Sequence, residues 1–303
     1  MWQTEHVRAR LHAAGFATSR VEIRTTGDMV QDVPLARIGG RALFTRQIDD
    51  AMLDGRIDLA VHSLKDLPTT LPDGIVLVAV GEREDPRDAL VGRGPLTWEE
   101  LPERAVVATS SLRRRAQLLR VRSDLEVRDV RGNVDTRLGK LDASHDWTAI
   151  VLAAAGLMRL GYESRIGQRL PPAVMLPAPG QGALAVTARE GDTAAASAAR
   201  SIHHGPTALA VAAERAFLRT LEGGCQVPVG ALASPEGGVL RLHGRVVSLR
   251  GERTIEGQET SAARDELAAD DLGVRLADRL LGDGAASILA EVRAEAAPVI
   301  PEP

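Results

Sequence analysis

The sequence predicts an α/β protein made of two similar doubly wound lobes and a C-terminal α+β domain. Short apolar strands alternate with helices of about ten residues in two successive blocks, a pattern typical of parallel sheets covered by helices. An isolated apolar strand follows at residues 183–187, and its return into the first sheet would join the lobes by two crossings. Consecutive strands followed by helices then indicate the α+β domain.

The first block is expected to form domain 1, from residues 1–82 together with 183–202. Its expected helices cover residues 2–14 and 42–53, and its expected strands cover 21–24, 57–62, 75–80 and 183–187. Apolar residues recur at helical spacing in the second helix, and glycine or proline flanks the strand at 57–62. Residues 81–86 form a charged turn and are a candidate hinge.

Residues 83–182 are expected to form domain 2 and residues 203–303 the C-terminal domain. Expected strands of domain 2 are 105–109, 125–130 and 149–154, with helices at 112–121 and 134–141 and a short one ending at Gly161. Ser110 and Ser111 are good N-cap residues for the helix that follows them. The C-terminal domain is expected to contain a helix at 207–221, strands at 227–233, 239–248 and 253–257, and two terminal helices.

Composition limits the possible functions. Of 303 residues, 44% are apolar and 26% charged, as in a soluble globular protein. A net charge of −4 argues against nucleic-acid binding, and no stretch approaches a membrane span. The single cysteine, Cys225, excludes an internal disulfide and fits a reducing cytoplasm. His203 and His204 lack further ligands at metal spacing, so we expect no metal.

Polar residues crowd the end of a predicted strand at residues 61–68 (VHSLKDLP). Ligands of open α/β sheets bind at the carboxyl ends of the strands. Asp66 could carry a proton or stabilise a cationic intermediate, and Lys65 could contact an anion. The alternative is a surface turn whose lysine and aspartate face water.

A second candidate site lies at residues 109–115 (TSSLRRR). Arginines in the first turn of a helix oppose the helix dipole, which makes sense if an anion binds there. Arg131, Arg137 and Arg159 follow related strand ends and could converge on the same cleft. The alternative is a solvated helix face in a chain that uses 35 arginines and only two lysines.

The third candidate is Cys225, in the loop LEGGCQVPVG at residues 221–230. Two glycines precede the thiol and Pro228 follows it, so the thiol is expected on a tight loop that exposes it. A lone cysteine can also be a buried space-filling residue.

Taken together, these segments resemble the hydroxymethylbilane synthase (porphobilinogen deaminase) family of tetrapyrrole biosynthesis. The matching runs are VHSLKDLP at 61–68, EREDPRD at 82–88, TSSLRR at 109–114, RGN at 131–133 with TRL at 136–138, AGLMRLG at 155–161, LPAPGQGA at 176–183 and LEGGCQVPVG at 221–230. The resemblance implies a cytoplasmic enzyme, monomeric, with no nucleic-acid or membrane partner. It also implies a dipyrromethane cofactor, attached by a thioether to Cys225.

The implied reaction starts with loss of ammonia from porphobilinogen, and the free α-carbon of the bound pyrrole chain attacks the resulting azafulvene-like electrophile. Four additions and a hydrolysis release hydroxymethylbilane. Asp66 matches the catalytic aspartate, which stabilises the developing cation. The cofactor-binding residues implied by the family are Cys225, Lys65, Ser63, Ser111, Arg113, Arg114, Arg131 and Arg137. The implied substrate-binding residues are Arg159, Phe44 and Gln181.

The chain departs from the family at its start. Members begin with a strand and a loop of the type Thr-Arg-x-Ser-Pro-Leu-Ala before a helix that reads like Trp2-Gln3-Thr4. Domain 1 is therefore expected to lack its first strand, either because the start lies upstream or because the chain is a truncated remnant with weak folding and little activity. A further alternative is a two-lobed anion-binding protein of the periplasmic-receptor type, without turnover.

Overall fold

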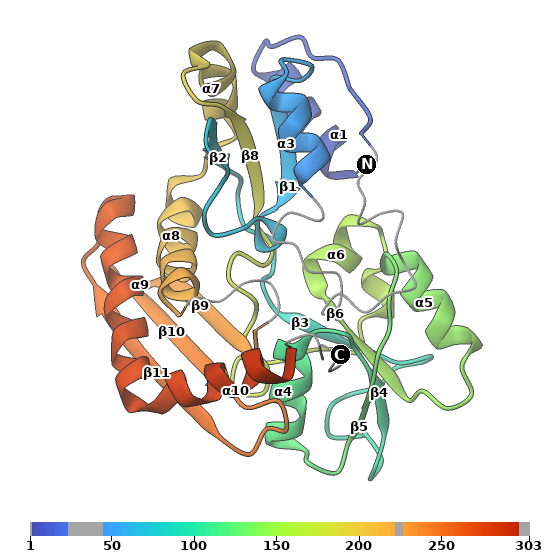
Figure 1. Cartoon of the computed structure of the whole chain (residues 1–303). Coiled ribbons are helices and arrows are strands. Elements are labelled where there is room, and N and C mark those ends of the chain that lie inside the picture. The colour runs from blue at the N-terminus through green and yellow to red at the C-terminus, as the bar shows by residue number, and fades with distance from the viewer. Residues whose placement is uncertain (1, 24–44, 222–226, 297–303) are drawn as a thin grey trace, which may run out of the picture.

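The computed structural model describes residues 2–23, 45–221 and 227–296. Three β-sheets organise this part of the chain, one in each of two α/β lobes and one in a C-terminal α+β domain (Figure 1). The predicted fold class is therefore confirmed. Phe44 and Cys225 lie outside the described residues.

Lobe 1 is built on a sheet with the strand order β1-β8-β2. Its elements are α1 (Trp2–Ala13), α3 (Arg46–Leu53), β1 (Leu59–Ser63), η2 (Leu64–Asp66), β2 (Ile75–Val80), β8 (Leu184–Arg189), α7 (Thr193–Ala199) and η4 (Arg200–Ile202). β8 lies between β1 and β2 and is antiparallel to both, with Val186 opposite Val61. The predicted return of this strand into the first sheet is confirmed.

The prediction of a strand at residues 21–24 is wrong for residues 21–23, the part that the structure describes. Residues 21–23 form no strand, and Val21 is 53% exposed. An apolar residue in that position buries too little surface to hold the segment against a sheet. The helix α1 instead covers lobe 1, because Val7 and Leu11 pack into the core beside Ala79.

Lobe 2 has a five-stranded sheet with the order β5-β4-β6-β3-β7. Its elements are β3 (Asp88–Val91), β4 (Val106–Ala108), α4 (Leu112–Val121), β5 (Glu126–Arg128), α5 (Val134–Ala143), β6 (Ala149–Ala153), α6 (Ala154–Arg159), η3 (Glu163–Arg165) and β7 (Gln168–Arg169). β4 is parallel to β5 and β6, whereas β3 is antiparallel to β6 and β7. Parallel pairing was expected in both lobes, but among the described strands it occurs only in β5-β4-β6. The strands next to the lobe crossings, β3 and β8, are antiparallel to their neighbours.

The C-terminal domain packs helices against one antiparallel sheet with the order β11-β10-β9. Its elements are α8 (Gly205–Thr220), β9 (Val229–Glu236), β10 (Val239–Val247), β11 (Thr254–Ser261), α9 (Glu266–Leu280), the kinked segment η5 (Leu281–Ala285) and α10 (Ala286–Ala296). Phe217 of α8, Leu242 of β10 and Leu276 of α9 meet in its core, each fully buried. No helix among the described residues is both long and apolar enough to span a membrane.

Two chain segments cross between the lobes and touch each other. The amide of Glu84 donates to the carbonyl of Gly182 at 3.1 Å. Arg83, next to this contact, forms two hydrogen bonds with Glu214 of α8, at 2.6 and 3.1 Å. Glu214 is 0% exposed and also accepts from the amide of Gly180 at 2.7 Å. The crossing is therefore tied to the C-terminal domain by a buried carboxylate.

Candidate active site

The candidate site begins where β1 ends, at the edge of the lobe 1 sheet. The chain leaves Ser63 in extended backbone and forms the single turn η2. Leu64 is buried in the core, whereas Asp66 is exposed. The buried leucine anchors a turn that presents Lys65 and Asp66 at the carboxyl end of the strand.

Lys65 reaches toward the crossing between the lobes. Its Nζ donates to Oε1 of Gln181 at 3.3 Å. Burial lowers the pKa of Lys65 to about 8, and Arg114 adds to this lowering while Asp66 opposes it. An anion bound beside Lys65 would stabilise its charged form and raise this pKa again.

Two arginines in the first turn of α4 share one buried carboxylate, that of Asp88 at the start of β3. Nη1 of Arg113 donates to Oδ2 of Asp88 at 2.7 Å, and Nε of Arg114 donates to Oδ1 at 2.9 Å. Ser111 caps the helix as predicted, since its Oγ accepts from the amide of Arg114 at 3.4 Å. The two arginines are only 5% and 6% exposed, so the alternative of a solvated helix face is wrong.

Asp88 and Gln181 join the two lobes. Burial alone would raise the pKa of the Asp88 carboxyl, but Arg113, Arg114 and Lys65 outweigh it and hold that pKa well below its usual range. Nε2 of Gln181 donates to Oδ1 of Asp88 at 3.1 Å and to the carbonyl of Pro86 at 2.7 Å. A continuous hydrogen-bonded chain therefore runs from Lys65 in lobe 1 to the α4 arginines in lobe 2.

Asp66 lies among these cations. Within the described chain, the Asp66 side chain forms no hydrogen bond or ion pair. Its negative charge opposes the lowering of the pKa of Lys65, Arg114 and Arg137. The site thus combines one exposed carboxylate with positive charge from both lobes.

Arg131 and Arg137 come from the loop between β5 and α5 and from the first turns of α5. Nε of Arg137 donates to the carbonyl of Gly132 at 2.7 Å. Burial lowers the pKa of Arg137 to about 10, with Arg114 adding to the effect. For the Arg131 guanidinium, no hydrogen-bond or ion-pair partner is found among residues 2–23, 45–221 and 227–296.

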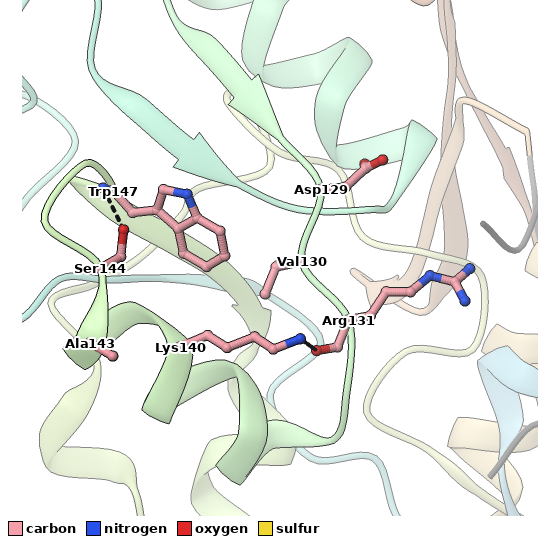
Figure 2. Close-up of a pocket in the computed structure, with 7 residues that line it drawn as sticks. All are labelled: Asp129, Val130, Arg131, Lys140, Ala143, Ser144 and Trp147. Carbon is pink, nitrogen blue, oxygen red and sulfur yellow. Dashed lines mark hydrogen bonds between the residues drawn. The ribbon is translucent and has the colours of Figure 1, made fainter. Parts of the chain in front are cut away.

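A cavity of about 510 Å³ lies beside this loop and is lined by Asp129, Val130, Arg131, Lys140, Ala143, Ser144 and Trp147 (Figure 2). Nζ of Lys140 donates to the carbonyl of Arg131 at 3.1 Å. The guanidinium of Arg131 points away from Lys140 and Trp147. The cavity is therefore on the far side of the loop from the arginine's charged end and is not part of the candidate site.

Arg159 lies at the lobe crossing, at the end of α6. Its Nη2 donates to the carbonyl of Gly182 at 2.6 Å, and its guanidinium carbon is 5.6 Å from the ring centroid of Trp2. Burial lowers the pKa of Arg159, and the charge of Glu84 acts in the opposite direction. The structure therefore places Arg159 against lobe 1 and the crossing, without a direct bond to the Lys65–Gln181–Asp88 chain in the described residues.

Comparisons with known proteins show the family of this chain. Residues 1–197 match the family model described as Porphobilinogen deaminase, dipyromethane cofactor binding domain, and residues 208–282 match Porphobilinogen deaminase, C-terminal domain. The chain belongs to the porphobilinogen deaminase family.

Individual porphobilinogen deaminases match almost the whole length of this chain. The porphobilinogen deaminase of Moorella thermoacetica is 51% identical over 296 residues, covering 97% of this chain and 93% of the relative. That of Desulforudis audaxviator is 52% identical over 295 residues, covering 97% of this chain and 94% of the relative.

Among solved structures, the GluR0 ligand-binding core with L-glutamate matches 66% of this chain and 81% of its own chain, at 11% identity and a TM-score of 0.33. A putative methionine-binding lipoprotein of Bacillus subtilis covers 66% and 85%, at 11% identity and a TM-score of 0.39.

The donors of the site fit the dipyrromethane cofactor for which the porphobilinogen deaminase domain is named. Such a group carries several carboxylates and pyrrole N–H donors. The ammonium of half-buried Lys65 suits the carboxylates, as does the guanidinium of Arg131, which has no partner among the described residues. The carboxylate of Asp66, which no described residue engages, suits the N–H groups. The structure thus offers both kinds of partner around one turn.

Two residues that shape the site, Asp88 and Gln3, were not predicted as site residues from the sequence. Asp88 belongs to the matching run at 82–88, but the pattern gave no sign that its carboxylate is buried between two arginines. Gln3 was also missed, although its Nε2 donates to Oγ of Ser63 at 2.7 Å. An acidic residue directly before the apolar run ALV was the only local signal for Asp88.

Proposed function

We propose that this chain deaminates porphobilinogen and joins four molecules head to tail on a dipyrromethane primer attached to Cys225, releasing hydroxymethylbilane. The observation that carries this proposal is the carboxylate of Asp66, which no described residue engages, beside a cation cluster drawn from both lobes. A neutral ligand would not need so many buried cations, whereas each added pyrrole brings two carboxylates.

The cations and hydroxyls of the site bind the carboxylates of the pyrrole chain. The cofactor-binding group comprises Cys225, Lys65, Ser63, Ser111, Arg113, Arg114, Arg131 and Arg137, and the substrate-binding group comprises Arg159, Phe44 and Gln181. Gln181 contributes to substrate binding by holding Lys65, because both of its own amide hydrogens are taken up by Pro86 and Asp88. Arg159 can bind a substrate carboxylate if it leaves the carbonyl of Gly182.

Asp66 stabilises the positive charge that develops on the pyrrole ring when ammonia leaves. No described residue engages its carboxylate, so no contact with the described part of the protein has to break before it acts. A negative charge placed where positive charge develops in the transition state lowers the barrier. When bound, the dipyrromethane supplies the free α-carbon that serves as the nucleophile.

We also propose that the protein is a cytoplasmic monomer that acts on a small molecule without a nucleic-acid or membrane partner. The net charge of −4 argues against a nucleic-acid partner, and the single cysteine fits a reducing cytoplasm. Light scattering of the purified chain should give the mass of one copy.

Replacement of Asp66 tests the function. We expect Asp66→Asn to lower turnover of porphobilinogen by about 10²–10³-fold, the usual effect of removing one group that stabilises transition-state charge. Turnover is measured on protein whose intact mass shows it to carry the cofactor. Asp73→Asn, an exposed carboxylate in the loop after η2, is the matched control and should keep normal turnover. Equal activity of Asp66→Asn and the control would contradict the assigned role.

A further inference from the structure

A chain of hydrogen bonds links the C-terminal domain to Arg113 of the candidate site. It starts at Arg245 on β10, which is only 2% exposed. Nε and Nη2 of Arg245 donate to the carboxylate of Glu256, which stands opposite on β11, both at 2.8 Å. Nη1 of Arg245 donates to Oε1 of Gln117 in lobe 2 at 2.7 Å. A buried guanidinium thus bridges the C-terminal domain and lobe 2.

Gln117 continues this chain to the site. It is 1% exposed and lies on α4 one turn after Arg113. Its Nε2 donates to the carbonyl of Leu176 at 2.9 Å, and its Oε1 accepts from the amide of Leu176 at 2.9 Å. Nη1 of Arg113 donates to the same carbonyl at 2.8 Å. Because a guanidinium can only donate, Arg245 keeps the amide oxygen of Gln117 turned toward itself and leaves the amide nitrogen for Leu176.

A second contact from the same domain holds the other end of α4. Gly251 lies in the turn between β10 and β11 with φ of +77°, and a Cβ at this position would lie 2.3 Å from the backbone nitrogen of Arg120. The turn therefore packs directly against the last turn of α4, and Figure 1 shows α4 beside the C-terminal domain. The helix that carries Arg113 and Arg114 is held from the C-terminal domain at two places.

We propose that Arg245 is a positioning residue for Arg113 and acts through Gln117 and the carbonyl of Leu176. This inference rests on the proposed function, in which Arg113 binds a carboxylate of the pyrrole chain. Arg113 must divide its donors between Asp88 and that incoming carboxylate. The Leu176 carbonyl, fixed by Gln117, is the acceptor that holds Nη1 of Arg113 in place while this happens.

The test compares Arg245→Met with Gln117→Met, which breaks the same chain from the side of lobe 2. For both variants we expect KM for porphobilinogen to rise about tenfold, with kcat within about twofold of wild type, because binding of a carboxylate is weakened. Hydrogen exchange at the amide of Leu176 should become faster, since this amide donates to Gln117. In the double variant, Arg245→Met should add nothing to Gln117→Met.

Arg219→Met is the matched control, because Arg219 pairs with Asp270 inside the C-terminal domain and is 40% exposed. It should leave both KM and Leu176 exchange unchanged. A lower Tm in Arg245→Met with unchanged KM would mean that Arg245 only joins the domains, and additive effects in the double variant would equally overturn the proposal. Absence of turnover in the wild type would instead sink the proposed function, while Leu176 exchange would still decide whether Arg245 controls Gln117.

Discussion

Lys65 is one of two lysines in a chain with 35 arginines. Its environment explains why a lysine suits this position better than an arginine. Burial lowers its pKa to about 8, so its charge responds to bound anions in a way that an arginine's charge would not. Because this pKa is below the ordinary 10.5, the charged lysine disfavours folding below pH 8, and this cost fades as the pH rises from about 8 toward 10.5.

The pKa of Lys65 can be measured on cofactor-free protein, prepared as Cys225→Ser. We expect the rate of amine labelling at Lys65, followed by peptide mass spectrometry, to rise with a midpoint near pH 8. Lys140 is exposed and provides a second labelled lysine in the same digest. A midpoint near the ordinary lysine pKa of 10.5 would show that Lys65 is not buried among cations.

Asp88 balances the charge of two buried arginines, so its loss should be costly. We expect Asp88→Asn to lower the free energy of unfolding by about 3–5 kcal/mol in urea titrations, because it leaves buried charges uncompensated. Asp142→Asn, which removes the exposed partner of Arg165 in the same lobe, should cost at most about 1 kcal/mol. Similar losses in the two variants would argue against a buried ion cluster.

Residue chemistry was only partly predictable. The arginines of the TSSLRR run oppose the helix dipole, and this placement predicted an anion beside them. The anion that the structure shows beside the α4 arginines is the protein's own carboxylate, that of Asp88 on β3. Sequence spacing cannot reveal such a partner, because the pairing depends on how the fold brings the start of β3 within reach of the first turn of α4.

At the scale of elements, local signals predicted most of the fold. Ser111 caps α4, and the apolar run at 183–187 returns to lobe 1 as β8. The strands β3 and β7 were not predicted, since β3 directly follows a charged segment and β7 has only two residues. Both depend on pairing with distant strands and therefore leave little trace in local periodicity.

The two crossing segments meet at a glycine. Gly182 has φ of +90°, and a Cβ there would lie 2.4 Å from the carbonyl oxygen of Glu84. We expect Gly182→Ala to destabilise the protein by at least about 1–3 kcal/mol, from backbone strain and from separation of the two segments. Gly139→Ala, in the interior of α5 with open space around it, should be neutral or slightly stabilising. Equal urea midpoints for the two variants would contradict this close contact.

At the scale of the whole molecule, the sequence predicted two lobes and a third domain, and the resemblance predicted the family. Neither the sequence pattern nor the resemblance predicted how the C-terminal domain holds α4. The Arg245–Gln117 hydrogen bond joins residues that are 128 positions apart and belong to no shared motif. The fold therefore brings the α4 arginines of lobe 2, the exposed carboxylate of Asp66 from lobe 1 and the domain that contains Cys225 into one enzyme.

The intact mass of the protein tests the central claim most directly. Made in a host that produces porphobilinogen, the wild type should be heavier than its 32.2 kDa sequence mass by one dipyrromethane. Cys225→Ser should show the sequence mass alone. A wild-type chain with no added mass under these conditions would contradict a covalent primer on Cys225, and with it the proposed polymerisation.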